Sequence, residues 1–245
     1  MVFVDKVKNS SPPILEEYKK NNTKDWEEYF KNKSTKKPED LWNHEEIRKK
    51  LTDIFKECCA YCGRINDITE DGKYTAQVEH FRPKSKRPDL VYDWHNLNWS
   101  CKECNSVTMK GDYYKEDYMI FDPCDKIDVD YLIINEQNGE YQLKEEFAND
   151  KKIKERFDIT RKKTMINSRG KRRQKNYKDI KELLNEIKKY YKQSNELKSK
   201  VLEEKLSNTI KELQEVYNTS EFKLLAFSLI QQFQKDNPDI NLKIS

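Results

Sequence analysis

Hydrophobic residues recur at helical spacing near both ends of the chain. Residues 11–56 look helical, and Ser11-Pro12 is typical of a helix start. Further along this region, Ile47, Leu51, Ile54 and Phe55 follow the three- and four-residue spacing of one helix face. After residue 150, two stripes predict two long helices with a break near residues 193–195. The stripes are Ile180, Leu183, Leu184, Ile187 and Tyr191, then Leu202, Leu206, Ile210, Leu213 and Tyr217.

The last apolar segment has a pattern of its own. Ser220 is suited to cap a helix that ends before Pro238. Its apolar residues cover more than one face, which predicts either a deeply buried helix or a docking surface. They are Leu224, Leu225, Phe227, Leu229 and Ile230.

The middle of the chain loses helical periodicity and gains short strand patterns. Tyr74, Ala76 and Val78 alternate with polar residues, as in a strand. Residues 131–144 predict a hairpin that turns at Asn138-Gly139. Helices at both ends and short strands between them favour an α+β fold in a mainly helical protein.

Composition narrows the class of protein. Charged residues make up 38% of the chain and the mean hydropathy is −1.10, and the sequence contains no apolar run long enough to span a bilayer. The first residues lack the apolar core of a secretory signal, so we expect a cytoplasmic protein. In a reducing compartment, the six cysteines favour metal binding or free thiols over disulfides.

Basic charge is concentrated in one region. Residues 151–200 hold 19 Lys and Arg against 6 Asp and Glu, and residues 161–175 hold eight basic residues and no acid. A solvated helix face explains such a run equally well as a polyanion partner does. The candidate nucleic-acid contacts here are Arg161, Lys162, Lys163, Arg169, Lys171, Arg172 and Arg173.

Two Cys-x-x-Cys pairs predict a structural zinc site. In each of Cys59–Cys62 and Cys101–Cys104, two intervening residues let both thiolates reach one ion. Four thiolates complete the tetrahedral shell of Zn²⁺ and leave no open position for catalysis. Cys58 and Cys124 fall outside this pattern and are read as ordinary thiols. The 38 residues between the pairs imply an inserted segment.

That insert carries the candidate chemistry. Glu79 and His80 are adjacent, Asn96 follows, and Asn105 comes directly after Cys104. Phosphodiester hydrolysis needs an activated water and a hard cation on the phosphate. A histidine can take a proton from water, and carboxylate and amide oxygens suit Mg²⁺.

These motifs resemble the HNH (ββα-metal) endonuclease family. Within that family they are most similar to the HNH proteins of Septu-type and retron-associated anti-phage systems, which pair the nuclease with an ABC/SMC-like ATPase. The motifs are Cys59-Ala-Tyr-Cys62-Gly, Glu79-His80-Phe-Arg-Pro-Lys-Ser, Tyr92-Asp-Trp-His-Asn-Leu and Cys101-x-x-Cys104-Asn.

The resemblance implies roles position by position. His80 corresponds to the general base, Glu79 and Asn105 to the ligands of a catalytic Mg²⁺ or Mn²⁺, and Asn96 to the residue that orients His80. Arg82, Lys84 and Lys110 are expected at phosphate groups. We read His44 as structural and His95 as a packing residue or a phosphate contact.

The resemblance also implies a small zinc-stapled ββα-metal core embedded in helices. We therefore divide the chain into a helical N-terminal region (1–56), a zinc-bound nuclease core (57–122), a β-hairpin connection (123–150) and a basic helical C-terminal region (151–245).

Three alternatives remain at this point. A zinc-dependent nucleic-acid-binding module without catalysis explains the cysteines and the basic run but not Glu79-His80 with Asn105. A subunit that mainly docks an ATPase would use the helical C-terminal half. An RNA-cleaving nuclease, with tRNA as one example, would use the same motif, and DNA is favoured by the resemblance alone.

Overall fold

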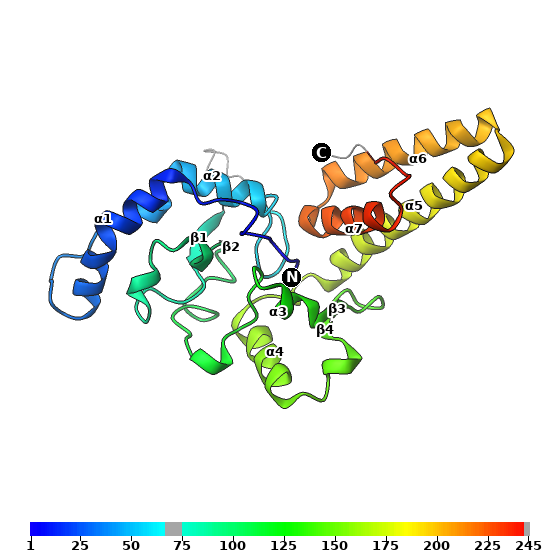
Figure 1. Cartoon of the computed structure of the whole chain (residues 1–245). Coiled ribbons are helices and arrows are strands. Elements are labelled where there is room, and N and C mark those ends of the chain that lie inside the picture. Colours follow the sequence, from blue (N-terminus) through cyan, green and yellow to red (C-terminus); the bar gives the residue numbers. More distant parts are fainter. Residues whose placement is uncertain (67–74, 243–245) are drawn as a thin grey trace. The chain divides into compact units, whose positions relative to one another are not determined.

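A computed structural model describes residues 1–66 and 75–242 of the chain (Figure 1). Its contacts divide the chain into two compact units. The first holds Met1–Ile134 and Tyr141–Ser168, and the second holds Asn135–Glu140 and Arg169–Ser245. Within the described residues, no helix is both long and apolar enough to cross a bilayer.

Two helices open the first unit, α1 (Pro13–Phe30) and α2 (Glu45–Ile54). Pro12, not Ser11, is the N-cap of α1, and Pro13 takes the first helical position, where its missing N–H costs no hydrogen bond. A 3₁₀ turn (Leu41–Asn43) precedes α2. His44 caps α2, since its Nδ1 accepts a hydrogen bond from the Glu46 N–H at 3.3 Å, which agrees with the structural role expected for it.

Strands β1 (Ala76–His80) and β2 (Leu97–Cys101) form an antiparallel pair in the first unit. Glu79 lies opposite Asn98 and His80 opposite Leu97. Ala76 and Val78 are buried, as the alternation predicts, whereas Tyr74 lies outside the described residues. Two 3₁₀ turns, Pro88–Leu90 and Trp94–Asn96, lie between the strands.

Turns follow β2 where a ββα-metal core leads us to expect a helix. Residues 102–112 contain successive turns. The Asn105 N–H donates to the Cys101 carbonyl at 3.1 Å, and the Gly111 N–H donates to the Ser106 carbonyl at 3.1 Å. Gly111 has φ +41°, a left-handed conformation that no helix interior contains. The chain therefore folds back on itself in this segment. The fold class that we predicted, helices mixed with short strands, is confirmed.

The rest of the first unit contains α3 (Lys126–Asp130), the hairpin β3 (Leu132–Ile134) and β4 (Tyr141–Leu143), and α4 (Lys151–Lys163). Shorter 3₁₀ turns cover Glu116–Tyr118 and Glu145–Phe147. The predicted hairpin is confirmed, with Gly139 at φ +70° in its turn. Arg156 on α4 makes a two-bond ion pair with Asp128 on α3, at 2.6 and 2.7 Å.

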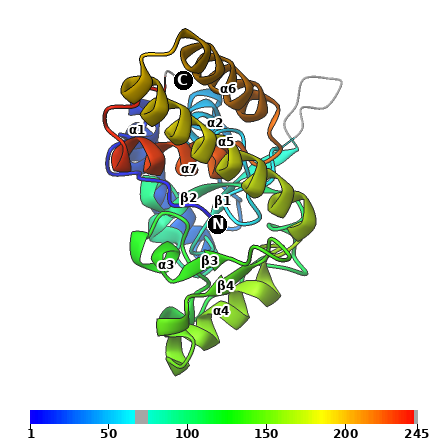
Figure 2. The same ribbon diagram turned by 90° about the vertical axis from the view of Figure 1, so that its right-hand side faces the viewer.

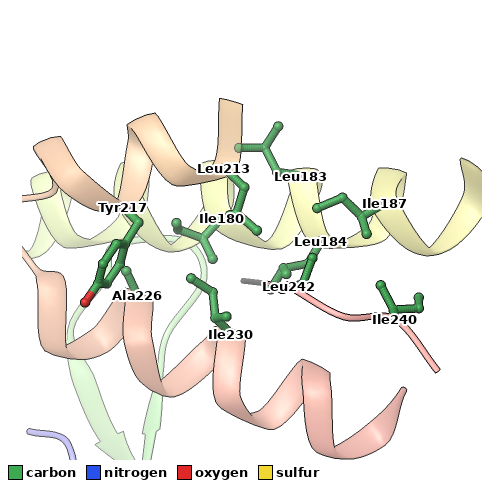
Figure 3. Close-up of a cluster of buried hydrophobic side chains, with 10 residues drawn as sticks. All are labelled: Ile180, Leu183, Leu184, Ile187, Leu213, Tyr217, Ala226, Ile230, Ile240 and Leu242. Atoms are coloured by element: carbon green, nitrogen blue, oxygen red, sulfur yellow. The ribbon is translucent and has the colours of Figure 1, made fainter. Parts of the chain in front are cut away.

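Three helices build the second unit: α5 (Gly170–Leu197), α6 (Lys200–Thr219) and α7 (Lys223–Asp236). Helices α5 and α6 lie side by side (Figure 2). Both predicted stripes supply core residues, and α7 completes the core with Ala226 and Ile230 (Figure 3). The final helix thus buries one face in this core, whereas Ser228, Gln231 and Gln232 on it are exposed.

The break between α5 and α6 lies a few residues later than the sequence suggests. Helix α5 continues through residues 193–195, where the Ser194 hydroxyl donates within the helix, to the Tyr191 carbonyl at 3.0 Å. The chain turns at Lys198, which has φ +48°. The prediction that Ser220 caps the last helix is wrong: α7 has Phe222 as its N-cap, and the Ser220 hydroxyl accepts the N–H of Phe222 at 2.9 Å, one residue before the helix begins.

The hairpin tip, residues 135–140, belongs to the second unit and packs on the start of α5. Arg173 is fully buried, and its Nη1 donates to the Gly139 carbonyl at 2.7 Å. The Gln174 side-chain amide donates to the Glu136 carbonyl at 2.8 Å. The prediction that Arg173 contacts nucleic acid is therefore wrong, because its guanidinium holds the hairpin tip in the interior.

Gly139→Ala should destabilise the second unit. A Cβ at Gly139 would lie 2.0 Å from the Gly170 carbonyl oxygen, and the φ of +70° adds backbone strain. We expect the free energy of unfolding, measured by urea titration with far-UV circular dichroism, to fall by about 2 kcal/mol or more. The exposed neighbour Gln137→Ala is the control and should change it by less than about 0.5 kcal/mol. Equal losses in the free energy of unfolding for the two variants would contradict the close approach of Gly139 to Gly170.

Candidate functional site: a cysteine cluster beside a polar pocket

The four predicted cysteines converge on one point. The Sγ atoms of Cys59, Cys62, Cys101 and Cys104 all lie within 4.8 Å of one another, and all four residues are buried. Cys62 Sγ and Cys101 Sγ are 3.9 Å apart, close to the edge of about 3.8 Å that a tetrahedron with Zn–S bonds of about 2.3 Å requires. The arrangement therefore fits a tetrahedral metal ion.

Backbone hydrogen bonds fix both cysteine pairs. After the first pair, Gly63 adopts φ +73° and donates its N–H to the Cys59 carbonyl at 3.0 Å. The Ala60 N–H donates to the Trp99 carbonyl at 2.8 Å, which joins this pair to β2. The Met165 N–H points at Cys104 Sγ, at 3.4 Å, and such donors stabilise thiolate ligands.

The two remaining cysteines stay outside the cluster, as the spacing predicts. Cys58 is buried next to the first pair without joining the four. Cys124 Sγ donates to the Asn98 side-chain oxygen at 3.4 Å.

A polar pocket of about 440 Å³ lies beside the cluster. It brings together three of the predicted catalytic residues, Glu79, His80 and Asn105, with Lys84. Successive strand residues point to opposite faces, yet both Glu79 and His80 border this pocket, because all five residues of β1 line it. Its other lining residues include Asp40, Trp42, Asn43, Arg48, Gln77, Val107 and Asp112. We call it the site pocket.

His80 is held in one orientation and one tautomer. Its Nε2 lies 2.9 Å from the Val91 carbonyl, and a carbonyl only accepts, so Nε2 carries the proton. Nδ1 is then the ring atom with a free electron pair. Trp42 packs edge-on against the ring at 4.8 Å between centroids.

Burial, with the nearby charge of Lys84, lowers the pKa of His80 to about 3. The cationic form is disfavoured because the ring leaves water and faces a like charge. At neutral pH the imidazole is therefore uncharged.

Asn96 lies behind the pocket and holds the segment that follows His80. Its side-chain oxygen accepts the Arg82 N–H at 2.7 Å, and its Nδ2 donates to the carbonyls of Arg82 at 3.0 Å and Leu90 at 3.1 Å. These bonds hold the backbone at Arg82 and Leu90, and the role of Asn96 in orienting His80 stays a prediction.

Glu79 is buried in a network with two other side chains. Its Oε2 accepts the Tyr61 hydroxyl at 2.8 Å, and its Oε1 pairs with Lys110. Burial and the Glu79 charge raise the pKa of Tyr61 well above its ordinary value, so the phenol stays a donor. Lys110 Nζ also donates to the His80 carbonyl at 2.7 Å.

Lys110 is thus not a surface phosphate contact, and that prediction is corrected. Its side chain is 1% exposed and its ammonium is paired internally, so it is unavailable to a polyanion at the surface.

Asn105 is half-buried on the turn after Cys104, and its Nδ2 donates to the Gln77 side-chain oxygen at 3.1 Å. Gln77 and Glu79 share one face of β1 because they are two residues apart. Glu79 and Asn105 together offer carboxylate and amide oxygens, the donor chemistry that suits a hard divalent cation.

The other predicted nucleic-acid contacts are dispersed. Arg82 lines a different pocket, together with Asp117, Asp122, Asp125 and Asp128. Arg161 and Lys162 are exposed and line a pocket with Met109 and Met165, next to the second cysteine pair, and Lys163 Nζ lies 5.5 Å from the Tyr113 ring. In the second unit, Lys171 is exposed, whereas Arg169 and Arg172 pair with Glu221 at 3.4 and 3.3 Å.

Sequence reasoning missed three residues around the site: Trp42, Tyr61 and Gln77. Strand alternation from Glu79 predicts the side of β1 on which Gln77 lies. Tyr61 lies inside the first Cys-x-x-Cys, so its proximity to the site was readable from the motif. No local signal places Trp42 against His80, because their contact crosses 38 positions of the sequence.

Comparison with known families defines the class of this domain. Residues 59–109 match the HNH endonuclease family model. The chain therefore contains an HNH endonuclease domain, and the predicted resemblance is confirmed.

Two curated relatives are more specific. The chain is 40% identical to the Septu protein PtuB of Bacillus thuringiensis, over 31% of this chain and 28% of that protein. It is 26% identical to the Septu protein PtuB of Bacillus mycoides (strain KBAB4), over 38% of this chain and 40% of that protein. The chain thus spans less than half the length of either relative. No solved structure matches it.

Cys101→Ser should release the metal ion and unfold the nuclease domain, because three thiolates no longer complete the shell. We expect the purified wild type to carry about one zinc per chain by plasma mass spectrometry, and the variant to carry much less and to lose helical signal. Cys58→Ser is the matched control and should keep its zinc. A folded Cys101→Ser protein with full zinc content would refute this role.

His80 should make stability depend on acid pH. Because its folded pKa of about 3 lies below its ordinary 6.5, the unfolded chain binds more protons between these values. The free energy of unfolding should therefore fall as pH drops below 6.5. Between pH 7 and pH 5, without added divalent cation, wild type should lose about 2 kcal/mol more than His80→Gln. Any acid loss of zinc affects both proteins, so equal losses would contradict a neutral buried His80.

Proposed function

We propose that this chain is a metal-dependent nuclease subunit that hydrolyses phosphodiester bonds in nucleic acid, with DNA the favoured substrate, as the effector of an anti-phage defence system. The observation that carries the proposal is the fixed, neutral His80 beside carboxylate and amide oxygens, within a segment that matches the HNH endonuclease family. The similarity to Septu protein PtuB supports the defence role.

His80 serves as the general base in this proposal. The Nε2 bond to Val91 leaves Nδ1 to take a proton from a water molecule. The water oxygen attacks phosphorus in line, the bond from phosphorus to the 3′ oxygen breaks, and that oxygen takes a proton from solvent water and leaves as a hydroxyl. The products carry 5′-phosphate and 3′-hydroxyl ends. Asn96 keeps the His80 segment in place during this step.

Two metal sites are part of the proposal. The four cysteines hold a structural Zn²⁺, whose full shell excludes a catalytic role. Glu79 and Asn105 hold a Mg²⁺ or Mn²⁺ ion. When bound, that cation stabilises the charge on the phosphate and on the leaving oxygen.

Basic side chains provide the path for the phosphate backbone. Lys84 lines the site pocket, and exposed Arg161 and Lys162 lie beside the second cysteine pair in the same unit. Lys163 and Arg82 are further proposed contacts in the first unit, and Lys171, Arg169 and Arg172 are proposed contacts within the second unit. Phosphate contacts of this kind bind both DNA and RNA, so RNA is the alternative substrate that the assay below includes.

An ABC/SMC-like ATPase is the proposed protein partner, as in the systems that the motifs resemble. The helices α5, α6 and α7 form a unit with its own core, which suits a docking part separate from the nuclease domain. Co-expression with the product of a neighbouring ATPase gene, followed by size-exclusion chromatography, should give one shared peak. Separate elution at micromolar concentrations would contradict this partnership.

His80→Ala should abolish cleavage while keeping the fold. Loss of a general base lowers the rate by about 10²- to 10⁴-fold, which a gel assay with plasmid DNA and with tRNA, each in Mg²⁺ or Mn²⁺, will measure. His95→Ala is the matched control, since His95 is exposed, and it should retain activity within a few-fold. Retained cleavage by His80→Ala rejects the assignment. Binding without cleavage in the wild type, with the ATPase partner present, would favour a non-catalytic module.

A further inference from the structure

The carboxylate proposed as a metal ligand already has a cation beside it. Lys110 Nζ pairs with Glu79 Oε1, and the two side chains are 1% and 0% exposed. The same ammonium donates to the His80 carbonyl at 2.7 Å. The Tyr61 hydroxyl takes the other carboxylate oxygen at 2.8 Å. Both oxygens of Glu79 therefore have partners before any divalent cation arrives.

The backbone holds Lys110 in this position. Its N–H donates to the Cys104 carbonyl at 3.4 Å, which ties it to a cysteine of the cluster. Gly111 follows at φ +41°, where an added Cβ would lie 3.0 Å from the Val107 carbonyl oxygen. The turn is thus tightly closed, and the Lys110 side chain is committed to the interior.

A divalent cation and this ammonium cannot both be well bound at Glu79. Mg²⁺ lies about 2.1 Å from a carboxylate oxygen, so it would be within a few ångströms of Lys110 Nζ. Like charges at that separation repel strongly where water is excluded. The pair is also electrically neutral, so adding a cation leaves excess charge in the interior unless an anion enters with it.

We propose that Lys110 competes with the divalent cation for Glu79, so that the free protein binds the cation weakly and binds it strongly only together with a phosphodiester. This inference rests on the proposed nuclease function, because it concerns the same site. The competition makes metal binding depend on substrate, and the nuclease without bound nucleic acid would hold little of its activating ion.

Mn²⁺ binding tests the competition without any cleavage. Free Mn²⁺ is counted by electron paramagnetic resonance during titration of the full zinc-loaded chain, whose four thiolates prefer zinc. Lys110→Met should bind Mn²⁺ at least about ten-fold more tightly than wild type, a change of about 1.4 kcal/mol. Glu79→Gln combined with Lys110→Met should lose this gain, because the freed carboxylate is gone.

Lys84→Met is the matched control. It removes a lysine from the same pocket, one whose Nζ lies 5.1 Å from the Trp42 ring centroid, and it leaves the Glu79–Lys110 pair intact. We expect its Mn²⁺ affinity to change by less than about three-fold. An equal gain in Lys84→Met and Lys110→Met would mean a general charge effect and would overturn the competition.

A measurement on the wild type covers the case in which Lys110→Met fails to fold, as judged by zinc content and circular dichroism. Wild-type Mn²⁺ affinity should rise at least about ten-fold when a phosphorothioate oligonucleotide that resists cleavage is added. An affinity that is already tight without the oligonucleotide, and unchanged with it, would overturn the proposal.

Failure of the nuclease proposal gives a different pattern. If the wild type cleaves neither DNA nor RNA while Lys110→Met gains Mn²⁺ affinity, the competition stands and the nuclease function falls. If the wild type cleaves in a His80-dependent way while Lys110→Met shows no gain in Mn²⁺ affinity, the nuclease function stands and the competition falls.

Discussion

The convergence of four thiolates on one point is the interaction on which the nuclease domain depends. Strands β1 and β2 have five residues each and, among the residues that the structure describes, pair only with each other, and an isolated two-stranded sheet is marginal in water. The cysteine pairs lie before β1 and at the end of β2, so a metal ion held by the four cysteines would join the two ends of the pocket-forming segment. Metal binding then contributes directly to folding, because the unfolded chain offers no preformed site.

The cysteine cluster also positions the polar side chains that are buried next to it. The turn after Cys104 carries Asn105 and Lys110, and the neutral pair of Lys110 with Glu79 lies against the His80 backbone. A buried ion pair contributes little net stability, and its value here is positional, since it joins the second cysteine pair to β1. His80 stays uncharged because burial disfavours its cationic form and the charge of Lys84 is nearby.

Much of this arrangement was readable from the sequence. Paired cysteine spacing predicts the cluster because two residues between thiols suffice for one ion, and the helical stripes predict the core of α5 and α6. The missed features depend on tertiary context. We expected Lys110 and Arg173 to be surface cations, but both side chains are buried and donate hydrogen bonds to backbone carbonyls. Turns occupy residues 102–112 where the resemblance implies a helix, and Gly111 there adopts a left-handed conformation. Helix α5 passes residues 193–195, where the Ser194 hydroxyl donates to the Tyr191 carbonyl within the helix.

A crystal structure of the full chain with a phosphorothioate oligonucleotide and Mn²⁺ tests the central claim most directly, through the anomalous signal of the ion. The account predicts Mn²⁺ between Glu79 and Asn105, bound to a phosphate oxygen, with Nδ1 of His80 about 3 Å from a water in line with the phosphorus. A manganese peak away from Glu79, or Nδ1 of His80 turned into packed side chains, would contradict it.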